Sequence, residues 1–424
     1  MPFAIAQWRL TKFSTKSDFM KSKGILFLSN GHGEDAINCQ IVRALRASGA
    51  KPDLAAMPVV GDGDAYRRSS LPIIGPTSQM PSGGVFYMNP LYLVKDVGAG
   101  LIALTWQQLR AVRTHSHSYD LVVATGDIVA AAIARATARP YIIFLSAHSS
   151  YYEGRVNLGL ILWQLLSSEK CLAVFTRDAV TAADLNRQGL KKAEFVGNPV
   201  MDNLSATGKD LQLIASGRAI ALLPGSRLPE ATDNLILLLQ LVKQIATNST
   251  VPVQFRAALV PSMMLELDDI AARAGWLHKE GKLVFQEIKA PSSDKKLTAE
   301  VICYSDAFAD ILQQSSLVIG MTGTAIEQAA GLGKPVITIP GNGPSFTYRF
   351  AEAQNRLLGD SVQVIGTKPA NSEIIQEAAL AVDRTLQQKD YLETCVKNGL
   401  ERMGPAGGSQ QIANYITNYL SKNS

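Results

Sequence analysis

The chain of 424 residues is 47% hydrophobic and 18% charged, with a formal net charge of +5. The length predicts two domains, and the composition excludes a disordered protein. Aromatic residues make up only 7% and do not alternate with basic ones, which argues against a nucleic-acid-binding surface. The mildly basic balance is instead compatible with phosphate-bearing substrates or an anionic membrane surface.

The four cysteines are scattered without a CxxC pair, so the sequence supports neither a disulfide framework nor a zinc site. No apolar run reaches the roughly 18–20 residues of a membrane-spanning helix. Residues 1–22 lack the apolar core and cleavage site of a signal peptide, and we interpret them as a loose leader. We therefore expect a cytoplasmic protein that is in solution or lies on a membrane without crossing it.

Predicted strands and helices alternate through the first half of the chain. Residues 23–30 predict a buried strand, which leads through a glycine-bearing turn into a helix over residues 37–47. Further strands are expected over residues 54–60, 120–124, 141–147, 172–175 and 193–196, with a helix over residues 130–138. Residues 61–84 are rich in Gly, Pro and Ser, and we expect them to be mostly loop.

Two interpretations of residues 85–109 stay open, because this segment is both apolar and aromatic. It forms either a helix packed on the sheet or an exposed face that grips a lipid or a membrane. The choice depends on which of its side chains the rest of the domain covers.

The second half restarts after a polar stretch at residues 200–216. Strands are expected over residues 219–223, 253–259 and 301–304, and helices over residues 230–246, 348–358 and 411–420. Strands at residues 317–319 and 336–339 flank the turn Thr322-Gly323-Thr324 and a helix over residues 325–332. This unit aims backbone N–H groups and a positive helix end at one point, which favours a bound phosphate.

Alternation in both halves predicts an α/β protein with two doubly wound parallel sheets. We expect an N-terminal domain over residues 23–203 and a C-terminal domain over residues 204–404. Residues 405–424 then form a C-terminal helix that packs back toward the N-terminal domain. Ligands of such sheets bind beyond the carboxyl ends of the strands, so the loops there hold the candidate site residues.

The first of these loops contains Gly31-His32-Gly33-Glu34-Asp35. Its glycine spacing matches a dinucleotide-binding fingerprint, but no acidic residue closes the second strand, so we favour a glycine requirement of the turn itself. A histidine beside two carboxyl groups suits general base chemistry near neutral pH. Asp35 has a second interpretation, as a cap of the helix.

Four further titratable side chains lie at strand ends or in loops. Asp127 follows a strand and opens a helix, so it is either a helix cap or a catalytic carboxylate. His148 ends the strand at residues 141–147, where it is placed to meet a substrate. Asp62 and Asp64 lie in the glycine-rich loop, where carboxylates are common for turn reasons, so we predict no metal site.

One loop of the second half combines three features that suit a phosphate. Gly225 permits close backbone approach, Ser226 offers a hydroxyl, and Arg227 carries a planar charged fork that matches phosphate oxygens. We expect this loop to contact the phosphate.

The turn before the predicted helix at residues 325–332 supplies a second phosphate contact. Gly323 and Thr324 begin this helix, whose positive end faces the same ligand. Glu327 and Gln328 follow one turn later, within reach of a ribose.

Four motifs occur in a characteristic order. They are Leu222–Arg227 with Glu230, Val196-Gly197-Asn198-Pro199, Thr322–Pro335, and Pro344-Ser345-Phe346-Thr347-Tyr348. Together they resemble the donor-phosphate loop, the interdomain turn, the nucleotide-binding helix and the following segment of the lipid-A-disaccharide synthase family. More distantly they resemble the peptidoglycan enzyme that adds N-acetylglucosamine to lipid I. The similarity covers nearly the whole chain from Gly24.

The resemblance implies a GT-B glycosyltransferase, with two Rossmann-like domains that face each other across a cleft. The first domain would bind the acceptor and the second the nucleotide-sugar. The implied reaction moves a sugar from a UDP-sugar, of the UDP-N-acylglucosamine type, to a lipid-linked sugar phosphate, without a metal or a cofactor. It implies a place on the inner face of the cytoplasmic membrane, a role in lipid A biosynthesis, and substrate contacts from Gly31, Gly33, His148, Asn198 and Phe346.

The chain departs from the family pattern in two ways that bear on function. Gln328 stands where the superfamily has a ribose-gripping Glu, and the carboxylate lies one place earlier, at Glu327. Asp127 is present, but Ala124 replaces its acidic partner. The chain therefore looks like a related branch whose acceptor differs from the lipid A precursor.

We predict an inverting glycosyltransferase with Asp127 and His32 as candidate bases, and Glu34 or Asp35 as the orienting carboxylate. One alternative is a UDP-sugar epimerase of the same fold, which often carries paired acids where this chain has Glu327-Gln328. Another is a non-catalytic relative that binds nucleotide-sugar or lipid and has lost the chemistry.

Overall fold

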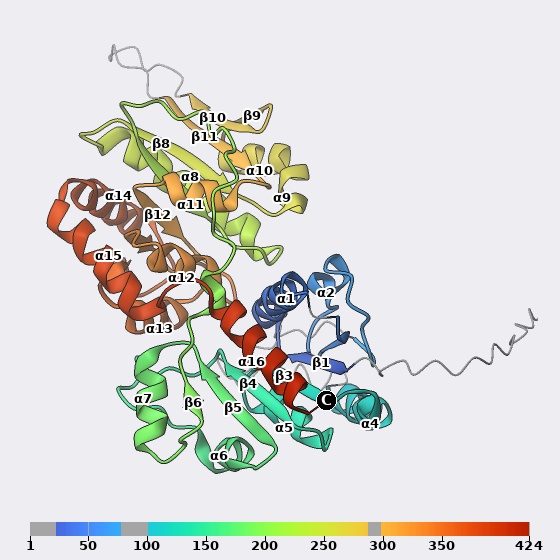
Figure 1. Ribbon diagram of the computed structural model, residues 1–424. Helices are drawn as coiled ribbons and strands as arrows, with labels where there is room; N and C mark the ends of the chain where they lie inside the picture. The colour runs from blue at the N-terminus through green and yellow to red at the C-terminus, as the bar shows by residue number, and fades with distance from the viewer. Residues whose placement is uncertain (1–22, 50, 78–100, 287–297, 424) are drawn as a thin grey trace, which may run out of the picture.

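Two sheets, one in each half of the chain, organise the structure (Figure 1). The computed structural model describes residues 23–49, 51–77, 101–286 and 298–423. The predicted leader at residues 1–22 and residues 85–100 of the apolar segment lie outside the described residues. Within these described ranges, no helix combines the length and the apolar character needed to cross a bilayer.

The sheet of the first half has six parallel strands in the order β2-β1-β3-β4-β5-β6. They are β1 (Gly24–Ser29), β2 (Asp53–Pro58), β3 (Leu121–Gly126), β4 (Tyr141–Leu145), β5 (Cys171–Thr176) and β6 (Ala193–Glu194). The helices among the described residues of this half are α1 (His32–Ala47), α2 (Asp64–Arg68), α4 (Leu101–His115), η2 (Ser116–Ser118), α5 (Ile128–Ala136), α6 (Gly159–Ser167) and α7 (Ala179–Arg187). Strands β1 and β3 are buried throughout, which explains their continuous apolar sequences.

Within the described residues, the sheet of the second half has eight strands in the order β14-β13-β12-β7-β8-β11-β10-β9, and β10 runs antiparallel to both of its neighbours, β11 and β9. They are β7 (Arg218–Leu223), β8 (Val253–Ala258), β9 (Leu277–Lys279), β10 (Lys282–Gln286), β11 (Thr298–Tyr304), β12 (Leu317–Gly320), β13 (Val336–Thr338) and β14 (Val362–Val364). The helices are α8 (Glu230–Asn248), α9 (Pro261–Leu265), α10 (Leu267–Ala274), α11 (Phe308–Gln314), α12 (Thr324–Gly331), α13 (Tyr348–Leu358), η4 (Gly359–Ser361), α14 (Ser372–Gln387) and α15 (Lys389–Met403). The short helix η3 (Pro199–Met201) precedes this sheet, and α16 (Gly408–Lys422) ends the chain.

Every predicted strand is present within a few residues of its expected bounds, but one helix boundary in the first half is wrong. Helix α1 begins at His32 instead of residue 37, and the described part of the predicted loop, residues 61–77, contains the short helix α2. Gly31 has an extended backbone, with φ −178° and ψ 175°, and the helix starts directly after it. The candidate residues His32, Glu34 and Asp35 therefore lie in the first turn of a helix and not in a loop.

Helix α4 contains the described end of the apolar segment and packs inward. Leu104, Gln108 and Val112 are buried, and the Gln108 side-chain amide donates to the Val59 carbonyl oxygen at 2.9 Å. Trp106 is 67% exposed. The packed-helix interpretation therefore holds for the core-facing side of α4.

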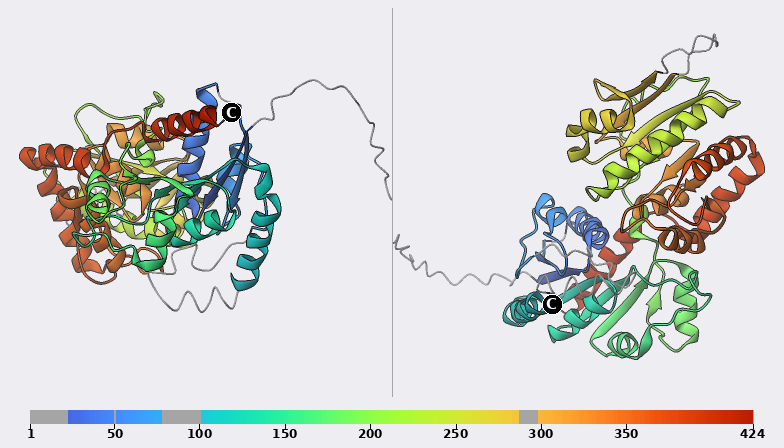
Figure 2. Two further views of the ribbon diagram at one scale, coloured as in Figure 1. Left: turned by 60° about the horizontal axis from the view of Figure 1, so that its bottom comes forward. Right: turned by 180° about the vertical axis from the view of Figure 1, so that it is seen from behind.

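The chain passes between the two sheets twice, and the two passages lie against each other (Figures 1 and 2). The Asp202 carboxylate in the first passage accepts hydrogen bonds from the backbone N–H groups of Gly407 and Ser409, at 2.5 and 2.8 Å. A Cβ added at Gly408 would lie 2.6 Å from the Gly197 carbonyl oxygen. Only glycine fits at position 408, because the two backbones are in direct contact.

After the second passage, α16 runs back along α1 of the first half (Figure 1). Ile412 and Ile416 are buried, and the Tyr415 ring packs edge-on against Phe175, with 5.4 Å between centroids. The Lys23 ammonium donates to the Leu420 carbonyl oxygen at 3.2 Å, near the end of this helix.

Candidate functional site

The carboxyl ends of the two sheets meet at one place, which we call the domain junction. Helices α1 and α12 approach each other there, since a Cβ added at Gly33 would lie 3.5 Å from the Thr324 hydroxyl oxygen. Arg177, directly after β5, forms an ion pair with Glu327 of α12 at 2.9 Å. Because α/β sheets bind ligands beyond the carboxyl ends of their strands, the domain junction is the candidate site.

The loop after β7 lies on the turn after β12. Gly225 has φ +106°, and a Cβ added there would lie 3.3 Å from the Met321 carbonyl oxygen. The Asn234 side-chain amide fixes the loop by donating to the Pro224 carbonyl oxygen at 3.0 Å. Two predicted phosphate contacts, the loop at Gly225 and the turn at Gly323, therefore lie side by side.

Arg227 projects from this loop toward the first domain. Arg227 and Ser226 are both exposed. Among the described residues, no carboxylate forms an ion pair with the Arg227 guanidinium. Burial lowers the pKa of the His32 imidazole, and the positive charge of Arg227 lowers this pKa further. Arg227 is thus an available cation at the domain junction, close to the start of α12.

The start of α12 has no side-chain cap. Gly323 is the N-cap, and the Gln354 side-chain amide holds its carbonyl oxygen at 3.0 Å. The helix therefore presents its first N–H groups and its positive end at the junction, beside Thr324. An anion is the group that this arrangement stabilises.

Phe346 lies in the core and not on the surface of the junction. Its side chain is 3% exposed and packs against Phe350 with 5.6 Å between ring centroids. The Glu230 carboxylate accepts from the backbone N–H groups of Ser345 and Phe346, at 3.0 and 2.7 Å. Glu230, which belongs to the motif at residues 222–230, therefore positions the motif at residues 344–348.

Gln328 and Asn198 point into the chain passage between the domains. The Gln328 side-chain amide donates to the Val200 carbonyl oxygen at 2.8 Å. Asn198 is fully buried, and its side-chain oxygen accepts from the Val200 N–H at 3.1 Å. Both side chains brace the passage in this structure.

Asp127 is the N-cap of α5. Its carboxylate accepts from the Val129 N–H at 2.9 Å and from the Asn30 side-chain amide at 3.1 Å. The capping interpretation is therefore correct, and any catalytic role of Asp127 is additional to it. Asp35, in contrast, does not cap α1, because Gly31 occupies the N-cap position.

Burial changes the protonation behaviour of three candidate residues. Burial raises the pKa of Glu34, with a smaller rise from the charges of Asp127 and Glu327, while Ser146 donates to its carboxylate at 3.0 Å. Burial lowers the pKa of His32 and of His148. Both histidines are therefore neutral near pH 7, the form that accepts a proton.

His32 fits against the chain because residue 61 is a glycine. A Cβ added at Gly61 would lie 2.9 Å from His32 Cε1, and Gly61 has φ +96°. His148 Nδ1 is buried and has no hydrogen-bond partner among the described residues. This ring nitrogen therefore keeps an unused hydrogen-bonding position.

Arg177 is the junction residue that sequence reasoning missed. It directly follows β5, so its strand-end position was visible in the sequence, but its partner Glu327 lies 150 residues further on. Its guanidinium also donates to the Ser146 carbonyl oxygen at 2.9 Å. No cluster of His, Cys, Asp and Glu among the described residues is arranged to hold a metal ion.

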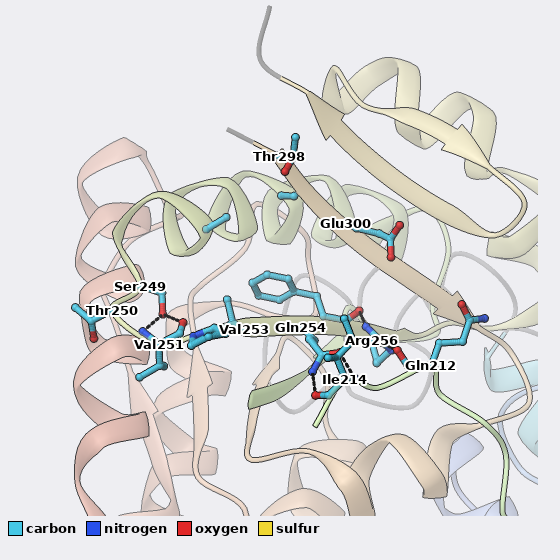
Figure 3. A pocket seen from close by; sticks show the side chains of 14 residues that line it. Gln212, Ile214, Ser249, Thr250, Val251, Val253, Gln254, Arg256, Thr298 and Glu300 are labelled. Atoms are coloured by element: carbon cyan, nitrogen blue, oxygen red, sulfur yellow. Dashed lines mark hydrogen bonds between the residues drawn. The ribbon is translucent and has the colours of Figure 1, made fainter. Parts of the chain in front are cut away.

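A separate pocket of about 520 Å³ lies at the opposite end of the second sheet (Figure 3). Gln212, Ser249, Gln254, Arg256 and Thr298 are among its lining residues. It is at the amino end of β8 and contains none of the predicted site residues, so we do not assign the function to it.

Comparison with solved structures decides the fold. The chain superposes on a UDP co-structure of MnaA from S. aureus with a TM-score of 0.56 and 13% identity, over 94% of this chain and 97% of that one. It superposes on MurG of Acinetobacter baumannii with a TM-score of 0.53 and 14% identity, over 93% and 99%. The fold is GT-B.

Other GT-B structures of this kind include a putative UDP-N-acetylglucosamine 2-epimerase from Listeria monocytogenes. Its TM-score is 0.56 at 14% identity, over 95% of this chain and 98% of that one. These identities establish the GT-B architecture alone.

Sequence comparison finds a partial match. A stretch of 147 residues is 24% identical to the UDP-N-acetylglucosamine–N-acetylmuramyl-(pentapeptide) pyrophosphoryl-undecaprenol N-acetylglucosamine transferase of Lacticaseibacillus casei. The match spans 34% of this chain and 39% of the relative. No protein-family model matches the chain.

Proposed function

We propose that the protein is a glycosyltransferase that moves a hexosamine-type sugar from a UDP-sugar to a lipid-linked sugar phosphate, without a metal. One observation carries the proposal: the unpaired Arg227 and the uncapped start of α12 converge at the domain junction. The partial match to an N-acetylglucosamine transferase supports the same donor. A lipid-A-disaccharide synthase-like acceptor follows from the resemblance of the motifs.

The chemistry of transfer makes two demands that these residues meet. Negative charge grows on the departing diphosphate in the transition state, and Arg227 with the positive end of α12 stabilises it. The acceptor hydroxyl loses a proton, which a neutral His32 or His148, or the carboxylate of Asp127, accepts. The Glu34 carboxylate, which accepts a hydrogen bond from the Ser146 hydroxyl at 3.0 Å, is the candidate for orienting this base.

Replacement of Arg227 by Ala tests the donor site. Loss of a charge-assisted contact to phosphate costs about 1.5–3 kcal/mol, so UDP affinity falls by roughly 10- to 100-fold. Calorimetric titration with UDP and turnover of UDP-N-acetylglucosamine measure the effect. Arg187→Ala is the control, because Arg187 is 71% exposed on α7. Unchanged UDP affinity and turnover in Arg227→Ala contradict the proposal.

A UDP-sugar epimerase is the second candidate, favoured by the structural likeness to a 2-epimerase. The two activities differ in their need for an acceptor. Incubation with UDP-N-acetylglucosamine alone, followed by chromatography of the sugar, distinguishes them. An epimerised sugar without acceptor supports the epimerase, whereas UDP binding with neither product supports a non-catalytic relative.

We extend the proposal to the membrane surface, since the acceptor carries a lipid. Helices α4 and α6 both pack against α5 (Figure 1). They expose Trp106 at 67%, Leu160 at 83% and Ile161 at 64%. Exposed apolar side chains of this kind bind a bilayer interface. We propose that this binding occurs at the inner face of the cytoplasmic membrane. Co-sedimentation of the protein with anionic phospholipid vesicles measures it.

A further inference from the structure

Arg177 and Glu327 form an ion pair that joins the two domains at the start of α12. Their charged atoms are 2.9 Å apart, with side chains only 8% and 15% exposed. Buried ion pairs of this kind contribute little net stability, because the lost hydration of the two charges offsets their attraction. A third charged group that enters the junction can therefore replace one partner of the pair.

Glu327 is the anion that balances Arg177 in this structure. The neighbouring carboxylate, Asp178, is already engaged: it accepts from the Thr181 N–H and from the Ser149 hydroxyl, both at 2.7 Å. The Arg177 guanidinium also donates to the Ser146 carbonyl oxygen, which carries no formal charge. Without Glu327, Arg177 requires a new anion.

An anion at the start of α12 would lie close to this guanidinium. Thr324 and Glu327 are three positions apart in α12, so their Cβ atoms are about 5–6 Å apart on one helix face. A rotation of the long Arg177 side chain covers this distance. The guanidinium fork also matches phosphate oxygens in geometry.

Other contacts hold the domains together while Arg177 changes partner. The Arg356 guanidinium donates to the Tyr152 carbonyl oxygen at 2.6 Å. The Arg402 guanidinium lies over the Tyr151 ring, 3.9 Å from its centroid. The exchange therefore needs a side-chain movement and not a separation of the domains.

We propose that Arg177 exchanges partners: Glu327 holds it in the unliganded protein, and a diphosphate at the start of α12 takes it over. The inference rests on the proposed nucleotide-sugar site. It adds a contact between the diphosphate and Arg177 of the first domain. The released Glu327 carboxylate then accepts hydrogen bonds from the hydroxyl groups that a nucleotide-sugar brings with its diphosphate. Glu327 thus competes with the ligand for Arg177.

Inorganic pyrophosphate, titrated calorimetrically into the full chain, tests the exchange. Glu327→Gln removes the competing charge and keeps the side-chain shape, so pyrophosphate binds about tenfold more tightly than to the wild type, within the range of typical coupling. Arg177→Met weakens pyrophosphate binding relative to the wild type. The double variant loses the tenfold gain. Asp233→Asn, which breaks the exposed pair with Arg273, leaves the affinity unchanged.

A static ion pair predicts a different pattern. The exchange is overturned if Glu327→Gln and the wild type bind pyrophosphate equally, if the gain survives in the double variant, or if neither protein binds it. Should Glu327→Gln fail to fold, Arg177→Met decides, since unchanged affinity there overturns the exchange. Sugar transfer is measured separately with UDP-N-acetylglucosamine. Transfer without the tenfold gain in pyrophosphate affinity contradicts only the partner exchange. The gain without transfer contradicts only the proposed transferase activity.

Discussion

Single residues beneath the domain junction form a buried polar network. The Tyr66 hydroxyl lies 2.6 Å from the Ser29 hydroxyl, and Ser29 donates to Asp35 Oδ1 at 2.6 Å. Asp35 is 1% exposed, and its Oδ2 has no partner among the described residues. Burial raises the pKa of Asp35 from 3.8 to about 7, with smaller contributions from the charges of Glu34 and Asp64. Ionising this carboxyl in the folded protein is therefore unfavourable.

We expect Asp35→Asn to remove a pH dependence of stability. Between about pH 4 and pH 7 the folded protein keeps the Asp35 proton and the unfolded chain loses it. Stability therefore falls as pH rises through this interval, by up to about 4 kcal/mol, and Asp35 adds no further slope above it. Urea unfolding at pH 5, 6, 7 and 8 measures the difference between variant and wild type. The same slope in both proteins contradicts the assignment, and Asp390→Asn, at an exposed carboxylate, is the control.

At the scale of elements, α16 completes the first domain although it ends the chain. Its apolar face covers α1, with Ile412, Ala413 and Ile416 almost fully buried. The exposed residues Gln411, Asn414 and Asn418 lie on the other side of the helix. This two-faced pattern shows that the helix stabilises the first domain through packing.

Truncation of the α16 packing face has a predictable cost. Ile416→Ala removes a fully buried side chain and leaves a cavity, so the free energy of unfolding falls by about 2–5 kcal/mol. Asn414→Ala, on the exposed side, changes it by less than about 0.5 kcal/mol. Thermal and urea unfolding of both variants compare the two effects. Equal stabilities would show that α16 does not support the domain.

At the scale of the whole molecule, exposed apolar residues mark the proposed membrane face, and the chain as a whole carries a positive charge. Leu160 and Ile161 are adjacent at the start of α6, and the formal net charge of the chain is +5. Insertion of these apolar side chains favours binding of this face to a bilayer, and the net positive charge of the chain favours association with anionic lipid.

We expect the double variant Leu160→Ser/Ile161→Ser to lose most of its binding to anionic vesicles. Wild-type binding weakens with added salt, because surface charges are screened beyond about 8 Å at physiological ionic strength. Leu265→Ser is the matched control, since Leu265 is 88% exposed on α9 of the other domain. Vesicle co-sedimentation at two salt concentrations measures both effects. Equal retention of binding in the double variant and in the control places the membrane face elsewhere.

The order of strands and helices, and the α/β class, were predictable from the sequence. Buried parallel strands are continuous apolar runs, and the turns between them contain glycine, so both signals are local. The turn at Gly323 and the loop at Arg227 were recognisable for the same reason. The start of α1 was not predictable. The backbone changes from extended at Gly31 to helical at His32, and no local sequence signal marks this change.

Only the tertiary structure decided which of these residues work together. Pairing of Arg177 with Glu327, and of Gln328 with the Val200 carbonyl oxygen, joins positions 150 and 128 residues apart. Nothing local marks such contacts, since they depend on how two sheets and two chain passages are placed in space. The physical reason is that the periodicity of a sequence determines which face of a helix or strand is buried. A charge pair across the junction depends instead on where a second residue, far away in the chain, is placed by the fold.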